Sequence, residues 1–375
     1  MEAPKKRIMV TVLDSINQTA MPYNEFILYR NKWYKEEQQV VILTGSKEQI
    51  AVGHIPESLI VKRAGKSPLK IWRILSEIVR QNRQEGQEVI IHIHSIQGAL
   101  CAFMGIKLLG LRTATIYTIH STFTGYKFYN KLFCAVNVLC ANKVTCVSNT
   151  SYEKMPNFLK KIKGANMLAL QNGVNEERIN KIVESIPAPK HQNHTLKFVY
   201  VARVIPLKNH IFLIDVLSRV PKGLDIKFVF VGKEDPQRQI RAYAEKKGVA
   251  DRIEWTGLIP REEVYKVLSS SDCYISSSTV EGLPVSVLEG MYCSLPAILS
   301  NIPQHKEVAN DCLSAIVLPF DTDSWVKEIT KFSSRGVDKR REMGIQSKEY
   351  VGASFSLKNM HDKYNTIYNQ IAKQF

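Results

Sequence analysis

Several kinds of segment are missing from this chain of 375 residues, and each absence excludes a class of protein. No run of about 18 or more apolar residues occurs, so the sequence predicts no membrane-spanning helix. No Gly-x-Gly-x-x-Gly follows a strand-like segment, which argues against a nicotinamide-dependent oxidoreductase. The seven cysteines include no Cys-x-x-Cys pair and most stand in apolar settings, which predicts buried thiols rather than disulfides or a metal site.

Signals for a leader segment and for a metal centre are also missing. The first residues lead directly into the apolar strand pattern of residues 8–13, with no separate apolar segment or cleavage site, so we expect a cytoplasmic protein. His92 and His94 have the spacing of two ligands on one face of a strand, but no carboxylate or cysteine cluster accompanies them. Asp321-Thr-Asp323 is better explained as a helix N-cap. We therefore expect no metal and no other cofactor.

Acidic residues are absent from the long stretch between Glu88 and Glu153, whereas basic residues continue through it. The net charge of +16 is uneven: residues 1–190 carry 26 Lys and Arg against 14 Asp and Glu, and residues 191–375 carry 25 against 21. A basic N-terminal half predicts contact with an anionic membrane or with a diphosphate-linked ligand. Nucleic acid is the competing explanation, but no nucleic-acid-binding motif supports it, so we expect no nucleic-acid partner.

Apolar strand patterns alternate with helical patterns along the whole chain, which predicts an α/β protein with parallel sheets. The stretch from Ile186 to His194 is rich in proline and polar residues, which predicts a linker. We expect one domain over residues 1–185 and a second over 186–355, with a terminal helix over 356–375 that has one apolar face. The expected helices of the first half include one continuous helix over residues 150–162.

The most informative motif is the stretch from Ser278 to Gly290, which holds two glutamates eight positions apart. A strand pattern precedes it, and Gly282 and Pro284 open a helix whose free N–H groups attract anions. Glu281 lies before this helix and Glu289 inside it, so the two carboxylates can meet different parts of one ligand. The alternative is an ordinary helix start, with Glu281 favoured by the helix dipole and Glu289 solvated.

Two cations follow another strand pattern in the second half. Arg203 comes at the end of that strand and Lys208 just before an apolar helix, where they can neutralise a diphosphate. The alternative for either residue is a solvated loop charge.

Together these two motifs resemble those of retaining glycosyltransferases of family 4. The glutamate pair is the more specific half of the resemblance. It implies the GT-B fold: two Rossmann-like domains whose parallel sheets face an interdomain cleft, with the C-terminal helix packing back on the N-terminal domain. It also implies an N-terminal domain for the acceptor and a C-terminal domain for a nucleotide-sugar donor, without a metal.

The resemblance also assigns roles to individual residues. Arg203 and Lys208 would hold the donor diphosphate, Glu289 the ribose hydroxyls and Glu281 the transferred sugar. His120, which ends a strand pattern, would contact the same sugar, although a histidine satisfied by backbone groups is the alternative. Further donor contacts are expected from Gly282, Leu283, Pro284, Val285, Gly232, Trp255 and Thr256.

The sequence departs from the family pattern at several positions. The first strand is not followed by a Gly-Gly loop, so the side chains of Asn17, Gln18 and Thr19 would make the donor contacts there. Gly232-Lys-Glu replaces a Gly-x-Gly, and Ser294 occupies a usual glycine position.

The function expected from these features is transfer of a hexosyl group with retention of configuration. The donor would be a nucleotide-sugar, with UDP favoured over GDP. The acceptor would be a saccharide or lipid-linked saccharide in bacterial surface or capsular polysaccharide synthesis, reached by peripheral contact with the inner face of the membrane. Two alternatives remain open: a nucleotide-sugar 2-epimerase of the same fold, and a catalytically silent sugar-nucleotide-binding protein.

Overall fold

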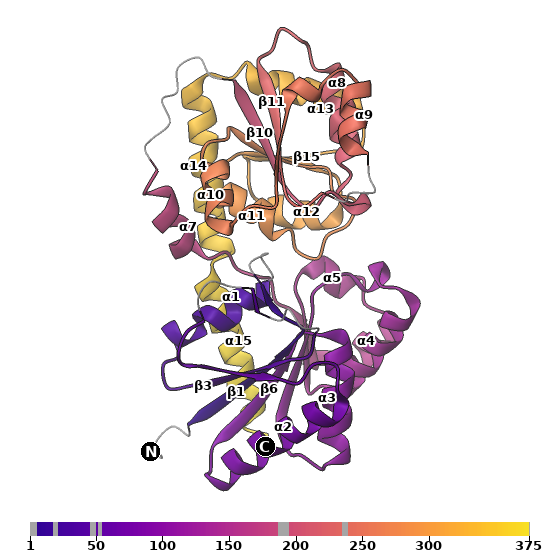
Figure 1. Ribbon diagram of the computed structural model, residues 1–375, viewed down its shortest axis with the longest axis vertical. Helices are drawn as coiled ribbons and strands as arrows, with labels where there is room; N and C mark the ends of the chain where they lie inside the picture. The colour runs from indigo at the N-terminus through magenta and orange to yellow at the C-terminus, as the bar shows by residue number, and fades with distance from the viewer. Residues whose placement is uncertain are drawn as a thin grey trace. The chain divides into compact units, whose positions relative to one another are not determined.

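The chain forms two compact units, each built around one parallel β-sheet (Figure 1). The computed structural model describes residues 6–17, 22–45, 50, 51, 55–186, 195–234 and 239–374. Unit 1 comprises Met1–Asn172 and Leu357–Phe375, and unit 2 comprises Gly173–Ser356. The division lies earlier than residue 185, where the sequence placed it, because helix α7 (Glu176–Val183) packs against helices α10 (Arg261–Ser269) and α11 (Val285–Tyr292) of unit 2.

The sheet of unit 1 has seven parallel strands in the order β5-β3-β1-β6-β7-β8-β9. Its central strands are almost wholly buried, which explains their continuous apolar sequences. The strands are β1 (Arg7–Leu13), β3 (Gln38–Leu43), β5 (Leu59–Arg63), β6 (Glu88–Ile93), β7 (Ala114–Ile119), β8 (Lys143–Cys146) and β9 (Met167–Ala169). Two short strands, β2 (Ile16–Asn17) and β4 (Ile50–Ala51), pair separately.

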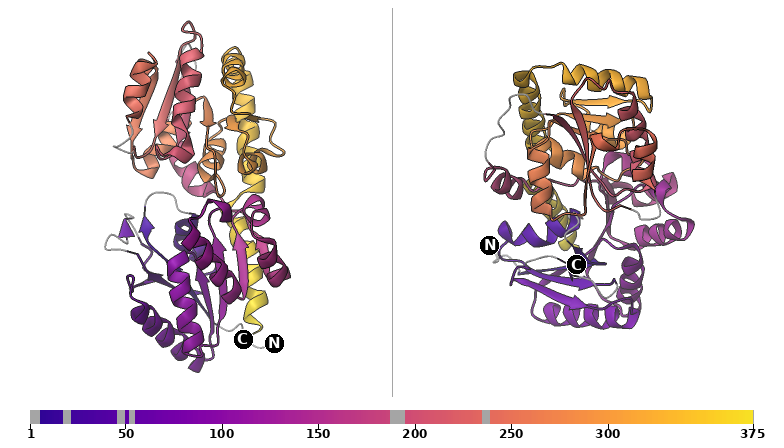
Figure 2. Two further views of the ribbon diagram at one scale, coloured as in Figure 1. Left: turned by 90° about the vertical axis from the view of Figure 1, so that its right-hand side faces the viewer. Right: turned by 45° about the horizontal axis from the view of Figure 1, so that its top comes forward.

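Helices cover both faces of this sheet (Figure 2). The α-helices of unit 1 are α1 (Pro22–Tyr29), α2 (Pro68–Gln84), α3 (Ile96–Leu108), α4 (Phe128–Cys140), α5 (Asn149–Glu153), α6 (Asn157–Lys163) and α15 (Leu357–Ala372). The continuous helix expected over residues 150–162 is wrong, because Pro156 divides it into α5 and α6. Proline lacks the N–H that a continuous helix needs at this position.

The terminal helix α15 packs on the sheet of unit 1, as expected. It contacts β6 and β7 and runs beside the sheet in Figure 1. Its apolar face, including Met360, Tyr364, Ile367 and Tyr368, is buried in the same core cluster as Met9 on β1.

The sheet of unit 2 has six parallel strands in the order β12-β11-β10-β13-β14-β15. They are β10 (Leu196–Val201), β11 (Ile226–Val231), β12 (Ile253–Gly257), β13 (Cys273–Ser276), β14 (Ala297–Ser300) and β15 (Ala315–Leu318). The other helices of unit 2 are α8 (His210–Arg219), α9 (Ile240–Lys246), α12 (Pro303–Ala309), α13 (Thr322–Ser333) and α14 (Val337–Ser354). Asp321 caps α13 by accepting a 2.9 Å hydrogen bond from the Ser324 N–H, as the sequence predicted.

Each sheet reverses its strand order once. The reversal falls between β1 and β6 in unit 1 and between β10 and β13 in unit 2. In open parallel sheets, ligands bind beyond the carboxyl ends of the strands that flank such a reversal. Among the described residues, no helix combines the length and apolarity needed to cross a membrane.

Candidate functional site

An ion pair lies at the strand reversal of unit 2. The Lys208 ammonium, which follows β10, contacts the Glu281 carboxylate, which follows β13. The Lys208 side chain is 19% exposed and the Glu281 side chain 13%. The structure therefore brings together two of the predicted site residues, and neither is a freely solvated loop charge.

Hydrogen bonds fix the two turns that carry this ion pair. The Tyr200 hydroxyl donates to the Lys208 carbonyl at 3.0 Å and lies 2.7 Å from Ser278 Oγ. Ser277 Oγ donates to the same carbonyl at 3.1 Å, and the Thr279 N–H donates to the Leu207 carbonyl at 2.8 Å. The turn after β13 is thus tied to residues 207–209.

A buried histidine supports these turns. His305 Nδ1 lies 2.9 Å from the Ser300 carbonyl oxygen, and its Nε2 lies 3.3 Å from Ser276 Oγ. Ser300 Oγ in turn donates to the Ser278 carbonyl at 2.6 Å. Burial lowers the pKa of His305 to about 4, so the ring is neutral at physiological pH. Sequence reasoning missed this cluster, although the serine run 276–278 at a strand end was a signal for it.

The second glutamate of the motif lies in a separate cluster. Glu289 is 4% exposed, and its Oε1 pairs with Arg261, accepts a 2.9 Å hydrogen bond from the Tyr265 hydroxyl and lies 3.7 Å from Arg178 Nη2. The Tyr265 oxygen also accepts from Arg178 at 2.6 Å and from Arg261 at 2.7 Å. Glu289 is therefore not a solvated helix residue. Each hydrogen bond that its carboxylate forms with the described residues goes to Oε1, which leaves Oε2 for a ligand.

Arg203 is exposed, and its guanidinium forms no hydrogen bond or ion pair within the described part of the chain. Its backbone lies beside Gly232, which has a φ of +149°. A Cβ atom at Gly232 would come within 2.3 Å of the Ala202 carbonyl oxygen. Gly232 is thus required by the close approach of two chain segments.

The ends of β11 and β12 are joined beside Gly232. Its N–H donates to the Gly257 carbonyl at 2.9 Å. The Arg241 guanidinium lies 5.3 Å above the Trp255 ring and forms a 2.6 Å ion pair with Glu234. The Gly232-Lys-Glu sequence, which departs from the family pattern, therefore supplies the carboxylate that holds Arg241 over Trp255. Thr256, predicted as a donor contact, lies next to Trp255 and its Oγ1 is 3.1 Å from the Gly257 carbonyl oxygen.

The loop before α11 holds the remaining predicted contacts of unit 2. Leu283 is buried, and its carbonyl accepts a 2.9 Å hydrogen bond from the Val285 N–H. The sequence predicted that Pro284 opens this helix. In the structure α11 begins at Val285 and Pro284 is its N-cap residue, so the helix starts one residue later than predicted. Gly282 precedes them in the same loop.

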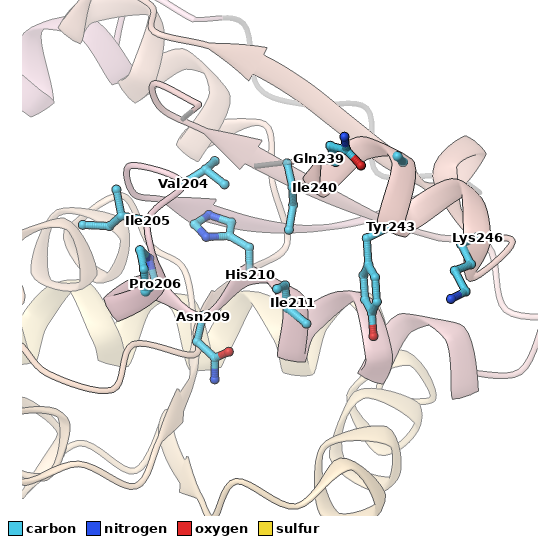
Figure 3. A pocket seen from close by; sticks show the side chains of 11 residues that line it. Val204, Ile205, Pro206, Asn209, His210, Ile211, Gln239, Ile240, Tyr243 and Lys246 are labelled. Carbon is cyan, nitrogen blue, oxygen red and sulfur yellow. The ribbon is translucent and has the colours of Figure 1, made fainter. Parts of the chain in front are cut away.

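A cavity of about 610 Å³ opens between the β10–α8 connection and α9 (Figure 3). Among the described residues that line it, none is a predicted site residue. His210 is buried beside it, with the Tyr200 ring stacked at 4.8 Å, and burial lowers the pKa of His210 to about 3. The lining residues are Val204, Ile205, Pro206, Asn209, His210, Ile211, Gln239, Ile240, Ala242, Tyr243 and Lys246.

His120, the predicted sugar contact, follows β7 in unit 1 and belongs to a row of histidines. Its Nε2 lies 2.8 Å from His94 Nδ1, and the His94 ring lies 4.1 Å from the His92 ring. His92 Nδ1 in turn lies 2.7 Å from the Tyr368 hydroxyl on α15. Burial lowers the pKa of His120 to about 4 and those of His92 and His94 well below the usual value, so all three rings are neutral. The spacing of His92 and His94 in the sequence suggests only a pair of metal ligands, so this row was missed.

The loop after β1 is held by a carboxylate. Asp14 Oδ1 accepts hydrogen bonds from Ser95 Oγ at 2.7 Å and from Thr44 Oγ1 at 3.0 Å. Asn17 pairs with Ala51 in the small sheet, whereas Gln18 and Thr19 lie outside the described residues. Within the ranges that the structure describes, no group of three or more His, Cys, Asp or Glu is placed to hold a metal ion.

Residues 182–350 match the family model described as Glycosyl transferases group 1. The matched residues all lie within unit 2. The match contains the ion pair of Lys208 and Glu281, the exposed Arg203 and the buried Glu289.

Two curated relatives are glycosyltransferases. The chain is 29% identical over 217 residues to the capsular polysaccharide biosynthesis glycosyltransferase CapH of Staphylococcus aureus, covering 56% of this chain and 57% of CapH. It is 22% identical over 300 residues to the UDP-Gal:alpha-D-GlcNAc-diphosphoundecaprenol alpha-1,3-galactosyltransferase of Escherichia coli, covering 74% of each chain. The chain therefore spans little more than half the length of CapH and of some further relatives.

A solved structure matches along nearly the whole chain. Anabaena HepE in complex with UDP superimposes with a TM-score of 0.74 at 13% identity, covering 97% of this chain and 100% of HepE. The two parallel-sheet units thus have the GT-B fold, as the sequence predicted.

Proposed function

We propose that this chain is a retaining, metal-independent glycosyltransferase of family 4 that transfers a hexosyl group from a UDP-sugar to a saccharide or lipid-linked saccharide. The observation that carries the proposal is the pairing of Lys208 with Glu281 at the strand reversal of unit 2. Both residues lie in the domain that matches glycosyl transferases group 1, and α11 begins shortly after Glu281.

The positive groups of unit 2 suit the diphosphate of such a donor. As the bond between the anomeric carbon and the phosphate oxygen breaks, its electron pair passes to the diphosphate, where Arg203, Lys208 and the N–H groups at the start of α11 stabilise the charge. Losing one such contact costs about 3 kcal/mol of barrier, or roughly a hundredfold in rate. Lys208, which pairs with Glu281, would turn to the phosphate when donor binds.

The carboxylates suit the sugar portions of the donor. Glu289 Oε1 is occupied by Arg261, Tyr265 and Arg178, so its Oε2 would accept hydrogen bonds from the ribose hydroxyls. Glu281 would hold a hydroxyl of the transferred sugar, and His120 of unit 1 another. The acceptor oxygen bonds to the anomeric carbon on the face that the diphosphate leaves, and its proton passes to a phosphate oxygen.

The relatives favour an acceptor made for bacterial surface or capsular polysaccharide. CapH is named for capsular polysaccharide biosynthesis, and the Escherichia coli relative is named for transfer to a diphosphoundecaprenol-linked sugar. A lipid-linked acceptor would place this chain in the cytoplasm at the inner face of the membrane, and the positive charge of the N-terminal half supports peripheral contact there.

The test is transfer from UDP-hexoses to saccharide and diphosphate-linked lipid acceptors, with NMR of the anomeric proton to establish configuration. Glu281→Gln and Lys208→Gln are expected to lower kcat/KM at least about a hundredfold. The matched controls are Glu263→Gln and Lys266→Gln, which neutralise an exposed ion pair on α10 and should leave the rate unchanged. Activity that survives a chelator supports metal independence.

Other results would overturn the proposal. Conversion of the donor to its C2 epimer without an acceptor would identify a 2-epimerase. Tight UDP binding without turnover of any donor would identify a silent binding protein. Product of inverted configuration would remove the chain from the retaining enzymes.

A further inference from the structure

Helix α4 of unit 1 carries a row of exposed apolar side chains along its whole length. Phe128, Leu132 and Leu139 are 85%, 57% and 46% exposed. Their spacing of four and seven residues places them on one face of the helix, because 3.6 residues complete a turn. Cys134 and Val138 are fully buried on the other side. Helix α4 thus packs into unit 1 through one apolar face and exposes a second apolar face to solvent.

Helix α6, which contacts α4, also carries exposed apolar side chains. Phe158 and Ile162, four residues apart, are 57% and 62% exposed, while Leu159 between them is fully buried. Helices α4 and α6 are in contact, and Lys163 Nζ donates a 3.2 Å hydrogen bond to the Leu139 carbonyl. We call the surface made by these five exposed side chains the α4–α6 face: Phe128, Leu132, Leu139, Phe158 and Ile162.

Lysines flank the residues of the α4–α6 face, and acidic residues are nearly absent from this part of the chain. Residues 89–175 contain nine Lys and Arg and a single acidic residue, Glu153. Four lysines form no ion pair with the described residues: Lys127 at the N-cap of α4, Lys131 on α4, Lys154 before α6 and Lys161 on α6. Their charges therefore remain available to an anionic partner.

We propose that the α4–α6 face is the part of this chain that inserts into the interfacial layer of an anionic bilayer. The inference rests on and refines the membrane contact proposed above, because it names the side chains that make it. Large apolar side chains flanked by lysines match the two halves of such an interface: the apolar groups enter the headgroup boundary, and the ammonium groups meet lipid phosphates.

Two other occupants fit the surface less well. A second copy of the chain would bring two strongly positive surfaces together, and like charges repel. Nucleic acid would satisfy the lysines but not Leu132, Leu139 or Ile162, since aliphatic side chains cannot stack on bases as aromatic rings do.

The first experiment measures binding to vesicles of phosphatidylcholine with phosphatidylglycerol, without donor or acceptor. Leu132→Glu and Ile162→Glu are expected to weaken binding about tenfold or more, because a carboxylate enters the headgroup boundary poorly and meets anionic lipid. Leu69→Glu on α2 and Leu313→Glu in unit 2 make the same change at positions that are 71% and 91% exposed. These controls should bind within about threefold of wild type.

A second pair of variants separates insertion from simple adsorption. Leu132→Trp should be quenched by brominated lipid and shift its emission to shorter wavelength on vesicles, whereas Leu69→Trp should do neither. Lys127→Gln and Lys131→Gln should each lower affinity about fivefold at low salt, and Lys222→Gln in unit 2 should not.

Equal losses in Leu132→Glu and Leu69→Glu, or an unquenched Leu132→Trp, would overturn the proposal. So would a wild-type dimer in solution that Leu132→Glu converts to monomer, since that assigns the face to a second copy. Vesicle binding needs no turnover, and the stabilisation of Leu132→Glu by UDP should match that of wild type. A failure of the membrane proposal is therefore distinguishable from a failure of the proposed glycosyl transfer.

Discussion

Gly232 in unit 2 shows how a single residue can matter both for backbone packing and for the proposed donor site. The sequence predicts that Gly232 lies near the donor, and the structure shows why no larger residue fits there. Its φ of +149° and the 2.3 Å approach of a Cβ atom to the Ala202 carbonyl oxygen both exclude a side chain. The neighbouring turn carries Arg203, so a change at Gly232 also displaces a proposed diphosphate ligand.

We expect Gly232→Ala to lower the free energy of unfolding by about 2 kcal/mol or more, because of backbone strain and steric overlap. Urea denaturation measures the effect. Gly223→Ala is the matched control, since a Cβ atom there would meet nothing within 4 Å and φ is ordinary. The control should be neutral or slightly stabilising, and equal losses in both variants would refute the steric argument.

The contact between His94 and His120 sets which nitrogen of His120 carries its proton. A neutral imidazole has one N–H, so if His94 Nδ1 donates to His120 Nε2, the proton of His120 lies on Nδ1. We expect His94→Leu to lower the rate of sugar transfer about tenfold, the value of one hydrogen bond, and His94→Asn, which keeps an N–H donor near that position, to lower it less.

The matched control for the His94 variants is His361→Leu. His361 is buried in the same core and stacks on Phe26 at 4.8 Å, but neither ring nitrogen has a hydrogen-bond partner among the described residues. Nitrogen-15 shifts of the His120 ring would report its tautomer directly. An unchanged tautomer in His94→Leu would contradict the assignment.

At the scale of secondary structure, the sequence predicts the alternation of strands and helices better than it predicts the helix ends. Parallel strands buried on both faces need continuous apolar runs, and these are visible without the structure. Helix ends depend on local capping, which a periodic pattern does not reveal. Pro156 divides one expected helix, and Pro284, which the sequence places at the opening of α11, is its N-cap residue instead of its first helical residue.

The site was predictable only in part, for a physical reason. Strand-end positions predicted that Lys208 and Glu281 lie close together, because the ends of parallel strands meet at one edge of a sheet, and the structure shows their ion pair. The partners of Glu289 were not predictable, since Arg178 and Tyr265 are 87 residues apart in the chain and meet only through the packing of α7 against α10.

The end of α11 offers a test at this scale. Ser294 follows the C-cap residue with a φ of +64°, a conformation that favours glycine. We expect Ser294→Gly to raise the free energy of unfolding by up to about 1 kcal/mol, since the left-handed conformation strains a residue with a Cβ atom.

Thermal and urea unfolding measure this change. The matched control is Ser333→Gly at the end of α13, which should lower stability by about 0.5–1 kcal/mol because glycine is a poor helix former. A loss of stability in both variants would show that Ser294 has favourable contacts that outweigh its backbone strain.

Across the whole molecule, buried histidines link stability to pH. All six histidines that the structure describes have lowered pKa values, four in unit 1 and two in unit 2, with burial as the main cause. The unfolded chain therefore binds more protons than the folded chain between about pH 6.5 and pH 4. Stability is fully present above this window and is lost as the pH falls through it.

We expect the free energy of unfolding to fall by several kcal/mol between about pH 7.5 and pH 5, with unit 1 the more sensitive unit. Urea unfolding at a series of pH values measures it. His361→Phe removes one titrating group and should make the dependence shallower. An unchanged dependence in this variant would show that other groups dominate the acid response.

The packing of α15 on unit 1 has a consequence for synthesis of the chain. Residues Met1–Asn172 leave the ribosome before α15 is synthesised. Tyr364 and Tyr368 of α15 nevertheless form part of the core of unit 1. Unit 2 can fold as soon as its own residues emerge, whereas part of the unit 1 sheet stays uncovered until α15 has been synthesised.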